Sequence, residues 1–103
     1  MRIEVVGDGT ISQQARSYAE YRVFAALTQS SETDNIQRVR VLLRRVKPGS
    51  DCEGIACTAT VKLVGSETCR IRTTGDHAYA AINRAVERIR TNAASGMVER
   101  VSI

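Results

Sequence analysis

Four residues in this sequence have side chains that often hold metals or act as nucleophiles and bases: Cys52, Cys57, Cys69 and His77. The spacing of the four as a set matches no zinc motif. Cys57 and Cys69 fall on neighbouring predicted strands. A hairpin that pairs residues 63 and 69 would hold them about 20 Å apart, too far for a disulfide. We therefore expect free thiols and no metal site, with His77 as an exposed residue in the first turn of a helix.

The other residue types that carry out catalysis form no recognisable arrangement. Gly7-Asp8-Gly9 follows a predicted strand and precedes a predicted helix, but it lacks the spacing of a phosphate-binding glycine loop. No serine has a histidine and a carboxylate that the sequence places beside it, and the acidic residues are scattered, mostly in loops. We therefore predict that the chain is not an enzyme and that it uses no cofactor and no small-molecule substrate.

Basic residues are the more informative group. The chain of 103 residues has 15 Lys and Arg against 11 Asp and Glu, which gives a net charge of +4. Lys47 and Lys62 are its only lysines, so arginine supplies 13 of the 15 basic side chains. The planar guanidinium of arginine binds phosphate through two hydrogen bonds at once, so this excess favours a polyanionic partner. Codon bias in a GC-rich genome is the alternative explanation.

Hydrophobic periodicity and turn residues predict the elements that position these side chains. Strands are expected over residues 2–6, 36–47, 54–64 and 68–74, and helices over residues 12–28 and 77–94. Ser12 is the expected N-cap of the first helix, with Thr10 and Gln13 as a competing capping box. Asp76 is the expected N-cap of the second helix.

This order of elements predicts an α+β fold, with a four-stranded mixed sheet and two helices packed on one face. The initial strand–helix–strand unit favours a parallel pair joined by a right-handed crossover, and the later strands are expected to be antiparallel. Both helices must bury their apolar stripes on the same side, because only one face of the sheet is apolar. Residues 1–95 are predicted to form a single domain, and residues 96–103 a tail that is either a strand or disordered.

The sequence also predicts where the protein works. Met1-Arg2-Ile3-Glu4 carries charge where a signal peptide would need an apolar core, and no apolar run approaches the roughly 20 residues of a membrane span. An odd number of cysteines without repeated spacing fits a reducing compartment. We expect a soluble, cytoplasmic protein with no membrane contact.

The open face of the predicted sheet is basic. In the second strand, Val39, Val41 and Leu43 share one side, and arginines occupy the other together with Leu42. Like charges on neighbouring strands repel, so an all-basic face favours a partner that supplies phosphate, although an arginine-rich solvated face is the alternative. No aromatic residue alternates with these arginines, so base stacking is not expected. The candidate RNA-binding residues are Arg38, Arg40, Arg44, Lys62, Arg70 and Arg72 on the sheet and Arg84, Arg88 and Arg90 on the second helix.

These features resemble the bacterial ribosome hibernation-promoting factor family, whose members are also called ribosome-associated inhibitors. The resemblance covers about residues 1–94. It is carried by the element order, the early Gly7, the first helix through Tyr18-Ala19-Glu20, and the motif His77-Ala78-Tyr79-Ala80-Ala81-Ile82-Asn83 in the second helix. The family's corresponding motif is similar to Asp-Met-Tyr-Ala-Ala-Ile-Asp.

The resemblance implies a function without catalysis. Members of this family bind the small ribosomal subunit and its rRNA in the channel used by messenger and transfer RNA, and so inhibit translation by occupancy. The chain would be a short form without the second, dimerising domain of the long members. Family members are rich in lysine on both helices, whereas here the first helix keeps only Arg16 and Arg22, and the second ends in Thr91-Asn92-Ala93-Ala94.

These departures leave a second class of function open. The chain would then be a non-ribosomal protein-interaction module of the same fold, for example a homodimer. Its contacts would be made by the open sheet face around Leu42 and Val64, or by pairing of the tail over Val98–Ile103 with an edge strand.

Overall fold

The computed structural model describes residues 2–28, 36–46, 54–65 and 68–94. In chain order the elements are β1 (Arg2–Gly7), α1 (Gln13–Thr28), β2 (Ile36–Val46), β3 (Gly54–Leu63), β4 (Thr68–Gly75) and α2 (Ala78–Ala94). The predicted α+β fold is therefore confirmed. Cys52 and the predicted tail over residues 96–103 lie outside the described residues, and the single domain over residues 1–95 stays a prediction.

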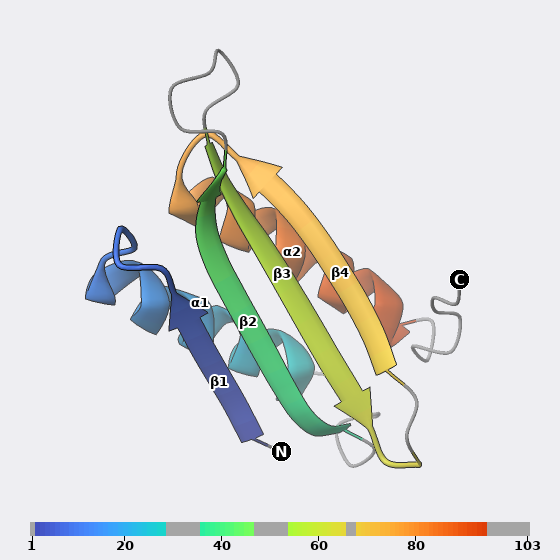
Figure 1. Ribbon diagram of the computed structural model, residues 1–103. Coiled ribbons are helices and arrows are strands. Elements are labelled where there is room, and N and C mark those ends of the chain that lie inside the picture. The colour runs from blue at the N-terminus through green and yellow to red at the C-terminus, as the bar shows by residue number, and fades with distance from the viewer. Residues whose placement is uncertain (1, 29–35, 47–53, 66–67, 95–103) are drawn as a thin grey trace.

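The four strands form one sheet in the order β1-β2-β3-β4. β1 runs parallel to β2, while β2–β3 and β3–β4 are antiparallel pairs. Figure 1 shows both helices on the same side of this sheet, with α1 behind β1 and β2 and α2 behind β3 and β4. The opposite face of the sheet is left open, and β1 and β4 are its edge strands.

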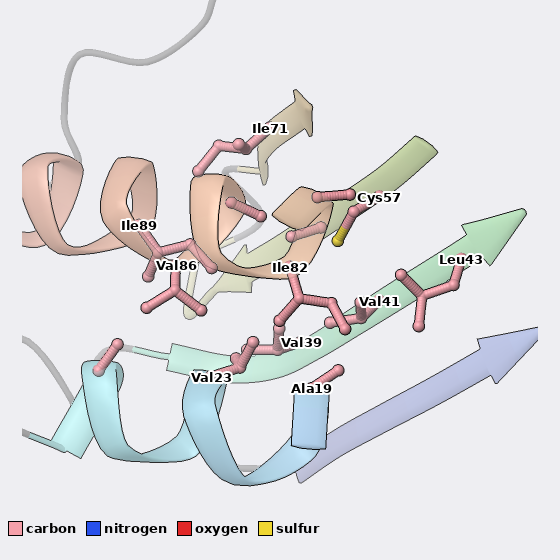
Figure 2. Close-up of a cluster of buried hydrophobic side chains, with 14 of the residues drawn as sticks. Ala19, Val23, Val39, Val41, Leu43, Cys57, Ile71, Ile82, Val86 and Ile89 are labelled. Atoms are coloured by element: carbon pink, nitrogen blue, oxygen red, sulfur yellow. The ribbon is translucent and has the colours of Figure 1, made fainter. Parts of the chain in front are cut away.

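The core lies between the sheet and the two helices (Figure 2). Strand alternation turns Val39, Val41 and Leu43 of β2 toward the helices, and all three are fully buried. Helical periodicity does the same for α1 and α2. Their buried side chains include Ala19 and Val23 from α1 and Ile82, Val86 and Ile89 from α2. Among the described residues, no helix is both long enough and apolar enough to cross a membrane.

The β3–β4 register differs from the predicted one. The structure pairs Val61 with Cys69 and Lys62 with Thr68, whereas the sequence analysis paired residue 63 with Cys69. A shift of two residues keeps every side chain on its face, so hydrophobic alternation could not detect the error. Cys57 lies opposite Thr73, four positions from Cys69 along β4, which still separates the two residues by about 13 Å along the strand. Both cysteines are buried free thiols.

The two helix caps give one confirmation and one correction. The Ser12 hydroxyl accepts a hydrogen bond of 3.1 Å from the Ala15 amide, as expected for the N-cap of α1. The competing capping box is wrong, because the Thr10 hydroxyl donates to Asp8 instead. At α2 the N-cap is His77 rather than Asp76, because Nδ1 of His77 accepts a hydrogen bond of 3.3 Å from the Ala80 amide.

Candidate nucleic-acid interface

The six sheet residues predicted to bind RNA all point away from the helices. They alternate with the buried residues of β2, β3 and β4, so the pleat carries them to the open face. The five arginines are exposed, and Lys62 is half-buried. Strand register thus gathers side chains that lie up to 34 positions apart in the sequence, from Arg38 to Arg72.

The register arranges the five arginines in two rows, one along β2 and one along β4, and β3 forms the floor between them with Lys62 near its end. Thr60 of β3 lies opposite Arg40 on one side and Arg70 on the other. Thr58, two positions earlier, lies opposite Leu42 and Arg72. Because neighbouring strands are about 4.8 Å apart, the rows on β2 and β4 are separated by about 10 Å. Small polar side chains therefore line the floor between two walls of arginine.

Acidic residues offset little of this charge. The Arg40 side chain lies 4.0 Å from the Glu4 carboxylate, measured from Nε to Oε1, and the two side chains are 60% and 54% exposed. An ion pair this long and this exposed is worth little in water. It is the one ion pair that joins a residue of the open face to another described residue. The face thus keeps its positive potential, which is what an electrostatic phosphate site requires.

The structure does not place the three α2 arginines on this face. The Arg84 guanidinium donates a hydrogen bond of 2.7 Å to the Thr74 carbonyl, and the Arg88 guanidinium donates one of 3.4 Å to the Arg72 carbonyl. Both acceptors belong to the edge strand β4. Arg90 pairs with Glu87 on the same helix at 3.3 Å. These three arginines therefore have structural partners, and two of them cover a strand edge.

Sequence analysis missed one basic residue of the face. Arg2 is exposed and lies beside Arg38 in the parallel β1–β2 register. Arg38 in turn lies opposite Lys62, so these three basic residues form a row that runs across β1, β2 and β3. Alternation along β1 turns the Arg2 side chain to the face opposite that of Ile3. The missing information was the register, which shows that Arg2 belongs to the same row as Arg38.

Three of the four residues considered first for metal or catalytic chemistry lie in the part of the chain that the structure describes, and each of them has a structural role. His77 caps α2 through Nδ1, and Cys57 and Cys69 are buried in the core. Burial raises the pKa of the Cys57 thiol to about 11, which keeps it protonated and unreactive at neutral pH. The described ranges contain no group of three or more His, Cys, Asp or Glu side chains that could hold a metal ion.

The sequence matches no family model and no curated protein. Two solved structures are similar to it over nearly the whole chain. A ribosomal subunit interface protein from Coxiella burnetii has a TM-score of 0.69 at 17% identity, with 96% of this chain and 100% of that chain covered. The N-terminal domain of Protein Y from Thermus thermophilus has a TM-score of 0.71 at 26% identity, with 93% and 99% covered.

These similarities define the class of the protein as an α+β domain of the type found in the Protein Y N-terminal domain. The ribosomal subunit interface protein, at its lower identity, shows the same fold. The resemblance to the ribosome hibernation-promoting factor family that the sequence motifs indicated is thereby confirmed.

Proposed function

We propose that this chain is a cytoplasmic, ribosome-associated protein that binds rRNA of the small subunit and inhibits translation by occupying the channel of messenger and transfer RNA. It acts without catalysis. Support comes from the structural similarity to a ribosomal subunit interface protein and to Protein Y. The observation that carries the proposal is the open sheet face, where arginines on β2 and β4 have almost no acidic counterpart among the described residues.

The proposed contact is made by the sheet face rather than by α2. Arg38, Arg40, Arg70 and Arg72 are exposed and extend from a rigid sheet, so their guanidinium groups are available to phosphate. Arg84 and Arg88 already donate to carbonyls of β4, so phosphate would have to displace those hydrogen bonds. The lack of aromatic side chains among the sheet arginines indicates binding to the RNA backbone, with little preference for base sequence.

The test is sedimentation with ribosomes on sucrose gradients at low and high salt. Each phosphate contact adds about 0.7 to 0.9 to the slope of log K against log salt, so four contacts give a slope of about −3. The double variant Arg40→Glu/Arg72→Glu should lose ribosome binding at about 50 mM salt. Its free energy of unfolding should stay within about 0.5 kcal/mol of that of the parent. The matched control, Arg84→Glu/Arg90→Glu, changes net charge equally on α2 and should keep most of the binding.

Two results would contradict the proposal in different ways. Loss of binding only in the α2 variant would move the RNA site from the sheet to α2. If the unmodified protein does not sediment with ribosomes even at low salt, ribosome association itself fails. The chain would then be a protein-interaction module of the same fold, whose predicted contact surface is the open sheet face around Leu42 and Val64 or the tail over Val98–Ile103.

A further inference from the structure

The two edges of the sheet differ in how they are covered. At β4, Arg84 and Arg88 donate hydrogen bonds to outward-facing carbonyls, which blocks the addition of another strand. The arginines of α1 do not do this for β1. Arg16 donates to the Ile11 carbonyl, and the Arg22 guanidinium lies 5.9 Å from the ring centre of Tyr18. β1 is therefore the edge at which a strand can be added.

An aromatic groove lies directly beside this edge. Ile3 of β1 lines it from one side, and α1 lines it from the other with Tyr21 and Phe24 and with the polar side chains of Ser17 and Glu20. Tyr21 is 69% exposed and Phe24 is 52% exposed. The whole chain has only three tyrosines and one phenylalanine, so half of its aromatic residues lie at this one exposed site. Two large aromatic side chains exposed side by side are a feature of interaction sites.

We propose that β1 pairs antiparallel with β1 of a second copy of this chain, around a two-fold axis that passes beside Ile3. The dimer would join the two sheets edge to edge. A two-fold axis perpendicular to the sheet keeps each face on its own side, so residues of the open face must lie opposite residues of the open face. An axis between two neighbouring residues would pair residues of opposite faces, so the axis must pass through a residue of β1. The charges on β1 decide which residue this is.

The charges of β1 select the axis at Ile3. With this axis, Arg2 lies opposite Glu4 of the second copy, and Glu4 lies opposite its Arg2, so two pairs of opposite charges form. With the axis at Glu4, the two Glu4 carboxylates would face each other, which is unfavourable for a cross-strand pair. With the axis at Val5, Glu4 would face Val6, and Arg2 would fall opposite Asp8, which lies beyond the end of β1, so no charge pair would form within the strand. Of these three axes, only the one at Ile3 pairs opposite charges within β1.

The same axis also relieves repulsion within each sheet. Arg2, Arg38 and Lys62 form an uninterrupted row of positive charges across three strands. Adding β1 of a second copy places a carboxylate at the open end of that row. These charge pairs form on the open face of the sheet, so they displace no contact between the sheet and the helices.

A second, independent feature coincides with this axis. Ile3 lines the same groove as Tyr21 and Phe24, so all three lie at the same level along β1. Rotation about an axis at Ile3 therefore brings the two grooves together on the helix side, where the aromatic residues of both copies would be buried. An axis farther along β1 would leave them apart. The charge pattern on one face and the aromatic groove on the other thus indicate the same arrangement.

Analytical ultracentrifugation from about 10 μM to about 1 mM tests the proposal, because a short edge strand makes a small interface. The unmodified protein should approach twice the 11.3 kDa mass of one chain at the upper concentrations. Arg2→Glu makes both open-face charges of β1 acidic, and Glu4→Arg makes both basic. Each variant alone should dimerise at least about tenfold more weakly, because both attractive pairs become repulsive.

The decisive result is the mixture of these two variants. An acidic β1 opposite a basic β1 restores two opposite-charge pairs, so the mixture should form a heterodimer although neither variant dimerises well alone. The double variant Arg2→Glu/Glu4→Arg should likewise recover dimerisation, and Ile3→Cys should form an intermolecular disulfide. A protein that stays monomeric at 1 mM, or a dimer that neither charge change weakens, would overturn the proposal. Because rescue restores binding, a folding defect in one variant cannot imitate the expected outcome.

Discussion

The Tyr18 hydroxyl donates a hydrogen bond of 2.7 Å to the side-chain oxygen of Asn83, which ties α1 to α2 across 65 positions of sequence. The same tyrosine ring meets the Tyr79 ring edge-on, with ring centres 5.0 Å apart and planes at 65°. The helix pair is thus joined by a polar and an aromatic contact in addition to the buried core that both helices share. Tyr79 and Asn83 belong to the motif that carries the family resemblance, which gives that motif a structural role.

Tyr18→Phe should lower the free energy of unfolding by about 1 kcal/mol, because it removes a partly buried hydrogen bond and retains the ring contact. In a domain of this size that loss lowers the melting temperature by about 4 to 8 °C. Tyr21→Phe deletes the same atom from a side chain that is 69% exposed and should change stability little. Urea unfolding of both variants is the measurement, and equal effects would contradict the role given to the Tyr18–Asn83 bond.

Gly75→Ala should destabilise the fold by about 1 to 3 kcal/mol. A Cβ atom at this position would lie 2.6 Å from the Ala81 amide nitrogen and 2.8 Å from the Ala80 Cβ, so the end of β4 and the start of α2 would have to move apart. Thr74→Ala alters the adjacent exposed residue without such a clash and serves as the control. Thermal unfolding that does not distinguish the two variants would show that this junction is not closely packed.

Asp8 makes stability depend on pH in the acid range. Hydrogen bonds from the Thr10 hydroxyl, from the Arg45 amide and from the Thr10 amide lower the pKa of its carboxyl from 3.8 to about 2. A pKa that is lower in the folded state gives stability that is present above pH 3.8 and is lost as the pH falls toward 2. The stability difference between the parent and Asp8→Asn should therefore shrink over this range. An NMR titration that finds an ordinary pKa for Asp8 would contradict this.

Removal of the arginines that cover β4 should promote self-association of the partly unfolded protein. Arg84→Ala/Arg88→Ala frees the Thr74 and Arg72 carbonyls at the strand edge. Arg90→Ala, whose arginine pairs with Glu87 instead, is the control and should behave like the parent. Light scattering during slow heating measures the effect. If the double variant and the control aggregate at the same temperature, the two hydrogen bonds do not protect the edge.

Local pattern was sufficient for most of the fold. The alternation in β2 assigned Val39, Val41 and Leu43 to the core and the arginines to the open face, and the structure agrees at each position. This works because the side-chain period of a strand and of a helix follows from backbone geometry alone. The N-cap of α2 is an exception, because the prediction placed Asp76 there and the structure uses His77.

The sequence by itself determined which residues face outward and how basic that surface is, because these depend on composition and on periodicity within single elements. Only the tertiary structure decided which of the basic residues belong together. It added Arg2 to the row of Arg38 through the β1–β2 register, and it assigned Arg84 and Arg88 to the edge of β4 through hydrogen bonds between distant elements. Register and helix placement depend on contacts between segments far apart in the chain, and a shift of two residues leaves the hydrophobic pattern unchanged.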